Sequence, residues 1–573
     1  MSFTQIELPV KPPRRFLPEN LSIDSWKKIK PFYDELKSRP VSTVGDLKNW
    51  LMDASEMEAV LQEDAGWRYI RMSCNTADHH LSEAFNFFIT QLQPRFAPYE
   101  HELHKKLLSS PFLGELPDEY KIFIRHIRRE VELFRSENIP LFTELHTEEQ
   151  KYAALVAEMT VEMEGKEMTL PQAGNYLKDT NRSRREEVYS KIAARRMQDR
   201  DKLDELYSAL VRIRNKVALN AGFRDYRDYM FSALGRFDYT VQDCINFQDA
   251  ISEVIVPVIE NLEIQRKKTL GLDSLKPWDL EVDVSGKPSL KPFSGVDELM
   301  DKTIICFENI DPMLGEYMQI MKAMKHVDLE SRKGKAPGGF NYPLYETGVP
   351  FVFVNAANSL RDLVTMVHEG GHAVHSLLTR EMEIVGFKDT PSEVAELASM
   401  SMELISMEHW DVFFSNPDDL KRARRQQLEK VLNVFPWVAT IDKFQHWVYT
   451  HPEHSAEERT LAWKKIYGEF AGKEVDWTGH QDSFDAAWQK QLHLYQVPFY
   501  YIEYGMAQLG AIAVWRNYKE NPRKGLENYL NALRLGYTRS IGEIYRTAGI
   551  RFDFSKEYVN ELTQFVLGEI EKL

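Results

Sequence analysis

Cysteine is scarce in this chain of 573 residues, which contains only Cys74, Cys244 and Cys306. The three cysteines lie far apart, and none has a second cysteine at the spacing of a paired metal or redox motif. Disulfide frameworks of small secreted domains and zinc sites built on several thiolates both need more cysteines at closer spacing. The sequence therefore indicates a reducing compartment and predicts no thiolate metal site.

Long apolar runs and basic blocks are also missing. No apolar run reaches the roughly 18 to 20 residues that a membrane helix needs, and the first residues, MSFTQIELPVKPPRRF, carry no apolar segment of the signal-peptide type. Acidic residues outnumber basic ones, 87 to 72, which gives a formal net charge of −15. We therefore expect a cytoplasmic protein with no nucleic-acid partner and no membrane partner. The sequence carries no indication of the oligomeric state.

The patterns that are present are mostly helical. Apolar residues recur at intervals of three and four through much of residues 22–178, again from Ser183 to Leu219, and from Val296 to about Lys325. Residues 159–170 instead predict a β-hairpin that turns at Glu-Gly. Residues 350–355, Pro-Phe-Val-Phe-Val-Asn, predict a short strand. That strand either pairs with an extended peptide or completes a small sheet, and the sequence leaves both open.

One helix is predicted with particular clarity, from Ser359 to Thr379. Ser359 followed three residues later by Asp362 is typical of a capping box, in which the two side chains satisfy unpaired backbone donors. Leucine, valine and alanine residues give the helix an apolar face that would bury it. The pair Gly370-Gly371 costs a helix about 1 kcal/mol per glycine, which indicates a close approach of another group to the backbone.

This helix carries His-Glu-Gly-Gly-His at residues 368–372. Residues four apart lie one turn above each other, so His368 and His372 can direct two imidazoles at one point while Glu369 lies beside them. Catalytic zinc takes three protein ligands and keeps a position for water, and a neighbouring carboxylate can accept a proton from that water. The alternative is a chance match on an ordinary amphipathic helix.

Candidates for a third ligand follow on a second predicted helix, with Thr390 as N-cap and Pro391 as first helical residue. This helix offers Glu393, Glu396 and Glu403. Their spacings of three and seven place all three near one face, so helical geometry does not choose among them. A short link after the second histidine, as in thermolysin-like peptidases, would favour Glu393.

Residues 396–403 read Glu-Leu-Ala-Ser-Met-Ser-Met-Glu, which resembles the Glu-x-x-Ser-x-x-x-Glu signature of the thimet oligopeptidase and oligoendopeptidase F family of zinc metallopeptidases. The chain is closest to the oligoendopeptidase F branch, because Gly-Lys-Ala-Pro-Gly-Gly-Phe at 334–340 and the following strand resemble that branch's approach to the active site. Asn220 to Tyr226 resembles the family's Gly-Phe-x-x-Tyr segment. The resemblance implies one zinc ion per chain, with Glu396 as third ligand and Glu403 orienting a ligand histidine.

Residues 493–505, HLYQVPFYYIEYG, resemble the family's substrate loop, in which a histidine and tyrosines hold the scissile peptide group. The resemblance implies this role for His493, Tyr500 and Tyr504, with Tyr501 as a competitor. The match departs from thimet oligopeptidase in tyrosine spacing and in having Pro498 where that enzyme has glycine. An aromatic core at helical spacing is the alternative.

The resemblance also implies an architecture and a function. The expected fold is mainly α, with two helical lobes enclosing a deep substrate channel and a small β-sheet beside the His-Glu-x-x-His helix. The expected regions are an N-terminal helical part with a β-hairpin over residues 1–199 and a zinc-peptidase catalytic part over residues 200–573. The expected activity is endopeptidase cleavage of short unstructured peptides, with Glu369 as general base and acid. A binding protein with structural zinc and an exopeptidase remain the alternatives.

Overall fold

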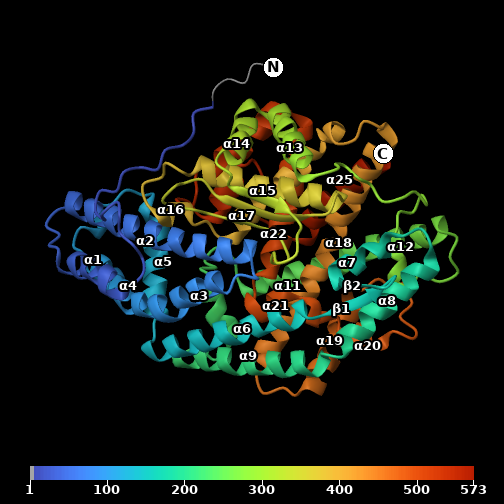
Figure 1. The fold of residues 1–573 in the computed structure, drawn as a ribbon, viewed down its shortest axis with the longest axis horizontal. Coiled ribbons are helices and arrows are strands. Elements are labelled where there is room, and N and C mark those ends of the chain that lie inside the picture. Colours follow the sequence, from blue (N-terminus) through green and yellow to red (C-terminus); the bar gives the residue numbers. More distant parts are fainter. Residues whose placement is uncertain (1–5) are drawn as a thin grey trace. The chain divides into compact units, whose positions relative to one another are not determined.

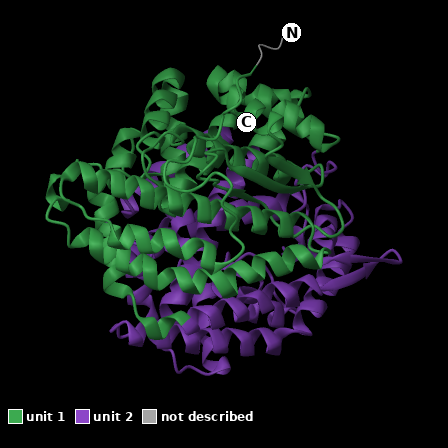
Figure 2. Ribbon diagram, turned by 60° about the vertical axis from the view of Figure 1, so that its left-hand side comes forward, with its two compact units in different colours: residues 1–139, 291–424, 507–552 green, residues 140–290, 425–506, 553–573 purple. Residues whose placement is uncertain are grey.

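The computed structural model describes residues 6–573, and most of its secondary structure is helical (Figure 1). The chain forms two compact units, coloured separately in Figure 2. Unit 1 comprises residues 1–139, 291–424 and 507–552, and unit 2 comprises residues 140–290, 425–506 and 553–573. The predicted mainly helical fold class is confirmed. The division of the sequence after residue 199 and the substrate channel stay predictions.

Unit 1 begins with helices that surround a buried core including Trp50, Phe96 and Tyr120. Its helices are α1 (Trp26–Ser38), α2 (Val44–Cys74), α3 (His79–Phe87), α4 (Gln93–Leu108), α5 (Tyr120–Leu133), α13 (Val296–Ile310), α14 (Pro312–Ala323), α15 (Leu360–Leu378), α16 (Val385–Lys388), α17 (Ser392–Met407), α23 (Pro522–Leu533) and α24 (Ile541–Thr547).

Unit 2 is also helical. Its helices are α6 (Ile139–Ala157), α7 (Leu170–Gly174), α8 (Arg182–Met197), α9 (Arg200–Asn220), α10 (Tyr226–Ala233), α11 (Val241–Ala250), α12 (Val256–Thr269), α19 (Ala456–Phe470), α20 (Gln481–Asp485), α21 (Leu492–Gln496) and α25 (Lys556–Glu571). Two long helices, α18 (Pro417–Thr450) and α22 (Tyr501–Glu520), contribute residues to both units. Among residues 6–573, no helix combines the length and apolar character needed to cross a bilayer.

The predicted β-hairpin is confirmed in unit 2. Strands β1 (Thr160–Met163) and β2 (Lys166–Thr169) pair antiparallel, and Thr160 lies opposite Thr169. The two turn residues, Glu164 and Gly165, both have positive φ, 54° and 74°. Positive φ at both central positions is the geometry of the two-residue turns that suit the twist of a hairpin.

A second, three-stranded sheet lies in unit 1, with strand order β3-β5-β4. The predicted strand forms as β5 (Phe351–Ala356). It pairs in parallel with β3 (Val327–Glu330) and antiparallel with β4 (Phe340–Tyr342). Because β5 is hydrogen-bonded to a strand on each side, it cannot pair with a peptide. Of the two roles that the sequence left open for this strand, the structure therefore supports completion of a small sheet. The edge strands β3 and β4 were not predicted, since each has only three or four residues and neither is joined to β5 by a two-residue turn like that between β1 and β2.

Helix α15 confirms the predicted helix, with Ser359 and Asp362 forming the capping box. The start of α17 corrects a prediction: the helix begins at Ser392, and Pro391 rather than Thr390 is the N-cap. Pro391 has φ −64° and ψ 153°, an extended conformation outside the helical region. The helical region predicted from Ser183 to Leu219 forms as two helices, α8 and α9, separated after Met197.

The approach of α15 to α17 explains one glycine of the Gly-Gly pair. A methyl group at Gly371 would lie 2.6 Å from Ser399 Cα and 2.8 Å from the Ala398 carbonyl oxygen of α17. These are backbone atoms of a helix, which cannot move aside as the end of a flexible side chain can. A methyl group at Gly370 would instead meet the Phe307 ring of α13 at 2.7 Å. The glycines therefore allow neighbouring elements to pack closely against the helix that carries both histidines.

We expect Gly371→Ala to lower stability, because its methyl group would push α15 and α17 apart. Overpacking of this kind costs about 1–3 kcal/mol, measured as a fall in the midpoint of thermal or denaturant unfolding. Gly468→Ala in α19 is the matched control, since within residues 6–573 no atom beyond the neighbouring turns of α19 lies within 4 Å of the added methyl group. Alanine is the better helix former by about 1 kcal/mol, so the control keeps or raises the midpoint. Equal midpoints for Gly371→Ala and wild type would contradict the close packing.

Candidate metal centre

Two imidazoles and one carboxylate converge where α15 and α17 pack together. His368 Nε2 lies 3.3 Å from Glu396 Oε2, and His372 Nε2 lies 3.7 Å from the same oxygen. One ligand atom from each of the three residues lies within 4.8 Å of the others. Ligand atoms at 2.0–2.1 Å from a shared tetrahedral ion are separated by about 3.3 Å. The three side chains are therefore spaced as ligands of one ion.

Glu403, about two helical turns beyond Glu396 on α17, contacts the other ring nitrogen of His368. The Nδ1 of His368 donates a hydrogen bond to Glu403 Oε1 over 2.7 Å. This bond holds a proton on Nδ1 and directs Nε2 toward Glu396, the orientation that a carboxylate partner gives to metal-bound histidines. Burial works against charge on His368, but the neighbouring Glu396 and Glu403 carboxylates outweigh it and raise its pKa well above the usual value.

Ser399 orients the carboxylate of Glu396. Its hydroxyl donates to Glu396 Oε2 over 3.0 Å and also lies 3.1 Å from the Glu396 carbonyl oxygen. Both side chains are buried, at 0% and 4% exposure, so the hydrogen bond is shielded from competing water. The serine of the Glu-x-x-Ser-x-x-x-Glu pattern thus has a physical role that spacing alone did not reveal.

The protonation state of His372, unlike that of His368, favours metal binding. Burial lowers the pKa of His372 to about 4, which leaves the imidazole neutral at pH 7 with a lone pair available. Two imidazole nitrogens with one carboxylate oxygen form a donor set that suits Zn²⁺. The residues present therefore fit the metal that the sequence pattern implies.

Glu369 lies beside the group and is buried, at 6% exposure. Burial raises the pKa of its carboxyl to about 7, with the Glu396 and Glu403 carboxylates adding to the shift. The glycine-rich segment before β4 runs close by, because a methyl group at Gly339 would lie 3.7 Å from Glu369 Oε1. A carboxyl group with a pKa near neutrality can both accept and return a proton.

Glu393, the candidate favoured by the shorter link, does not join the three-residue group among the described residues. It lies in the first turn of α17, is 2% exposed, and its main-chain carbonyl accepts a hydrogen bond from Tyr545 over 3.0 Å. The one-turn difference between Glu393 and Glu396 is what the sequence could not resolve by helical spacing. The structure groups Glu396 with the two histidines.

The remaining predicted residues, His493, Tyr500 and Tyr504, form an aromatic cluster in unit 2. The His493 ring centroid lies 5.9 Å from Tyr500 and 5.7 Å from Tyr504, and Tyr501 is closest at 5.0 Å. Tyr504 Oη lies 3.4 Å from His493 Nε2. The Gln491 amide contacts His493 Nδ1 at 2.6 Å. The sequence thus placed these residues together, and all three tyrosines adjoin the histidine.

Two buried arginines hold the segment that carries this cluster, and sequence patterns did not identify either. The Arg214 guanidinium donates to the main-chain carbonyls of Leu494, over 2.9 Å, and Tyr495. Arg236 donates to the carbonyl of Phe499 and to the Glu503 carboxylate, the latter over 2.7 Å. Neither arginine has a local signature in the sequence, since its partners come from a distant part of the chain.

Comparison with known proteins agrees with the fold and with the family resemblance. The model of peptidase family M3 matches residues 175–564, and that of the peptidase M3 N-terminal domain matches residues 16–134. The "oligoendopeptidase F homolog" of Lactococcus lactis is 24% identical over 439 residues, 72% of this chain and 68% of that protein. "Oligopeptidase PepF" of Bacillus subtilis is 23% identical over 391 residues, 66% of this chain and 55% of that protein.

Solved structures share the fold over nearly the whole chain. PZ peptidase A with an inhibitor has a TM-score of 0.92 and 24% identity, covering 98% of this chain and 99% of that one. Oligoendopeptidase F from Enterococcus faecium has a TM-score of 0.64 and 16% identity, covering 95% of this chain and 96% of that one. With the family model matching more than half of its residues, the chain belongs to peptidase family M3 and is a metalloendopeptidase.

Proposed function

We propose that the enzyme uses one zinc ion per chain, held by His368, His372 and Glu396, to cut internal bonds of short unstructured peptides in the cytoplasm. The observation that carries the proposal is the convergence of the three ligand atoms within 4.8 Å. The names of the oligoendopeptidase relatives support the substrate class.

The chemistry that zinc supplies at such a site is Lewis acidity, which brings the pKa of a water toward 7. In the proposed reaction, the Glu369 carboxylate accepts the proton of the water that attacks the peptide carbonyl. Glu369 then returns this proton to the nitrogen of the leaving amine as the peptide bond breaks. Its pKa near 7 suits both transfers, because neither protonation state is strongly favoured at neutral pH.

Charge that develops on the carbonyl oxygen needs hydrogen-bond donors. We assign this role to His493 with Tyr500 or Tyr504, as the family resemblance implies. Tyr501 remains a competitor, because its ring centroid is the one nearest to His493. The Arg214 and Arg236 contacts described above would keep the main chain of this segment in place during the reaction.

Substrate main chain is proposed to pair with β4, the edge strand of the sheet in unit 1. The order β3-β5-β4 leaves one side of β4 without a strand partner in the described chain. β4 lies close to the proposed base, because Asn341 Nδ2 lies 3.5 Å from the main-chain oxygen of Glu369. Main-chain pairing of this kind tolerates varied side chains.

A structural zinc site is the rival function. Such sites usually close all four metal positions with Cys or His ligands, whereas this group has three protein donors. A buried carboxyl with a raised pKa beside the ligands also has no use in a purely structural site. The geometry therefore favours catalysis.

We expect Glu369→Gln to lower hydrolysis by about 10²- to 10⁴-fold, the usual contribution of a general acid–base group. The amide cannot accept the proton, but the three ligands are unchanged, so the variant keeps about one equivalent of zinc at this centre. Peptide cleavage assays and metal analysis measure the two effects. Glu393→Gln, an equally buried carboxyl on α17, is the matched control and retains activity. Near-wild-type activity of Glu369→Gln would exclude Glu369 as the base.

A second pair of variants separates the two candidate ligands. We expect Glu396→Ala to lose zinc from this centre, because one of three donors is removed. Glu393→Ala keeps that zinc, because Glu393 is outside the three-residue group, and it lowers stability because a buried side chain is removed from the first turn of α17. Inductively coupled plasma mass spectrometry of the purified variants measures the metal, and thermal unfolding measures the stability. The reverse pattern would place the third ligand one turn earlier.

The substrate class is tested with length and folding as variables. The proposed channel admits extended peptides but excludes folded domains, since a domain of about 100 residues has a radius of gyration of about 13 Å. We expect internal cleavage of short peptides from a mixed library, identified by mass spectrometry of the products, and no digestion of a folded globular protein. Release of single residues from one end only would indicate an exopeptidase. Efficient digestion of a folded protein would contradict a channel that excludes folded domains.

A further inference from the structure

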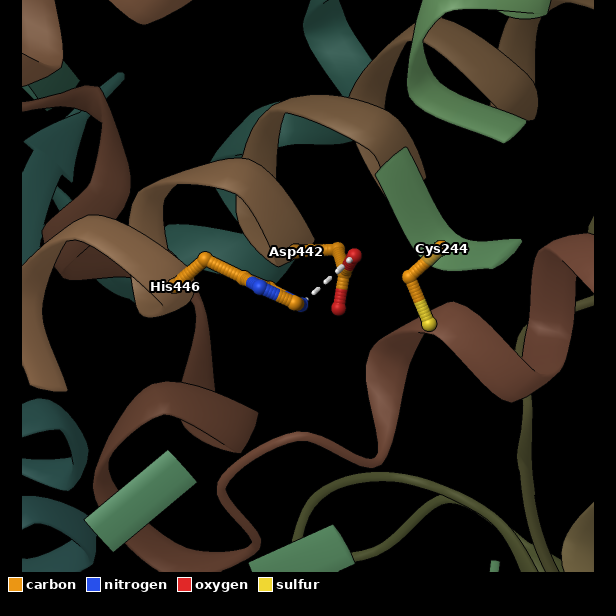
Figure 3. A group of neighbouring side chains, drawn as sticks. All are labelled: Cys244, Asp442 and His446. Atoms are coloured by element: carbon orange, nitrogen blue, oxygen red, sulfur yellow. Dashed lines mark ion pairs between the residues drawn. The ribbon is translucent and has the colours of Figure 1, made fainter. Parts of the chain in front are cut away.

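A second group of potential metal ligands lies in unit 2, formed by Cys244, Asp442 and His446. Asp442 and His446 are four residues apart on α18 and share one face of that helix, and Cys244 comes from α11. One ligand atom from each residue lies within 4.8 Å of the others. Figure 3 shows the Asp442 carboxylate flanked by the imidazole of His446 and the thiol of Cys244.

The group is deeply buried, and several of its polar atoms have no hydrogen bond. Cys244 and Asp442 are 0% exposed and His446 is 8% exposed. Among the described residues, neither ring nitrogen of His446 has a hydrogen-bond partner. Asp442 Oδ1 has none either. Leaving a buried polar group unsatisfied costs about 1–3 kcal/mol, and native proteins leave few such groups. Several in one place indicate that the site binds something else.

The distance between two of these side chains resembles that of ligands on one ion. His446 Nε2 lies 3.4 Å from Asp442 Oδ2 without forming a hydrogen bond. Ligand atoms on a shared tetrahedral zinc are separated by about 3.3 Å. Gln248 donates a hydrogen bond to Asp442 Oδ2 over 2.7 Å and thereby fixes the orientation of the carboxylate. Outer hydrogen bonds of this kind commonly position metal-ligating carboxylates.

We propose that Cys244, Asp442 and His446 bind a second divalent metal ion of the zinc class, separate from the ion at His368. A thiolate and an imidazole select a borderline-soft ion such as Zn²⁺ over Mg²⁺ or Ca²⁺. The thiol releases its proton to solvent when it binds, because the thiolate is the ligand form. The two negative ligands then neutralise the ion, so no net charge is buried. A water completes the fourth position.

This site would stiffen the segment that carries the predicted substrate contacts. The His446 ring packs edge-on against Phe499 at a centroid distance of 5.6 Å, and the adjacent Gln445 accepts a hydrogen bond from the Phe499 main-chain nitrogen. Phe499 has φ 67°, a left-handed conformation that is costly for a non-glycine residue. A metal that immobilises His446 would help to hold Phe499 in this conformation, between His493 and Tyr504.

The sequence predicted no thiolate metal site because Cys244 has no nearby cysteine partner. The folded chain supplies Asp442 and His446 from a helix almost two hundred residues further on. The rival occupant is an ordered water, which would satisfy the same polar atoms without a metal. A metal and an ordered water are distinguished by their contact with the thiolate. Only a bound metal ion can give a charge-transfer band with the Cys244 sulfur.

The test is cobalt substitution of the full-length enzyme, produced in minimal medium with Co²⁺ so that the buried site loads during folding. We expect about two cobalt ions per chain and a sulfur-to-cobalt charge-transfer band in the near ultraviolet. The His368 centre contains no sulfur, so the band reports the second site even if the proposed peptidase mechanism is wrong. Cys244→Ser removes the band and one ion, whereas Cys306→Ser, a matched change at another buried thiol, keeps both.

A double variant keeps the test decisive if Cys244→Ser does not fold. Cys74→Ser/Cys306→Ser leaves Cys244 as the only thiol of the chain, because the sequence contains three cysteines. Retention of the band in this variant assigns it to Cys244. Absence of the band from the wild-type enzyme, its loss in the double variant, or its persistence in Cys244→Ser would overturn the proposal, and one ion per chain without the band would identify water as the occupant.

Discussion

The close packing of α15 against α17 is the contact on which the metal centre depends. Gly371 permits it, because any side chain at that position would collide with the backbone of α17 at Ala398 and Ser399. Only at that separation can Glu396 Oε2 lie 3.3 Å from His368 Nε2 and 3.7 Å from His372 Nε2. Gly371, in the middle of the motif helix, therefore lowers helix propensity but allows the third ligand to reach the other two.

The helices and the metal motif were accessible from the sequence because they depend on local spacing. The capping box at Ser359, the two histidines four apart and the hairpin turn at Glu164-Gly165 each follow from contacts within a few residues. Periodicity could not choose between Glu393 and Glu396, because both lie near one face of one helix. The resemblance to a known signature made that choice, and the structure groups Glu396 with the histidines.

Features that depend on distant parts of the chain were missed. The β3 and β4 strands are short and, unlike β1 and β2, have no two-residue turn to mark their pairing, so the central position of β5 could not be predicted. The first turn of α17 was misplaced by one residue because Pro391 is compatible with both the N-cap and the first helical position. Arg214 and Arg236 bind carbonyl groups more than two hundred residues away, and no local signal marks such partners.

The central claim is that one metal ion lies between α15 and α17 and is bound by two imidazoles and the Glu396 carboxylate. Anomalous diffraction at the zinc absorption edge, from crystals of the zinc-loaded enzyme, tests it most directly. The account predicts a peak about 2.0–2.1 Å from the Nε2 atoms of His368 and His372 and about 2.0–2.2 Å from a Glu396 carboxylate oxygen. It also predicts Glu403 hydrogen-bonded to His368 rather than bound to the ion. No peak at this position, or a peak ligated by Glu393 or Glu403 in place of Glu396, would contradict the account.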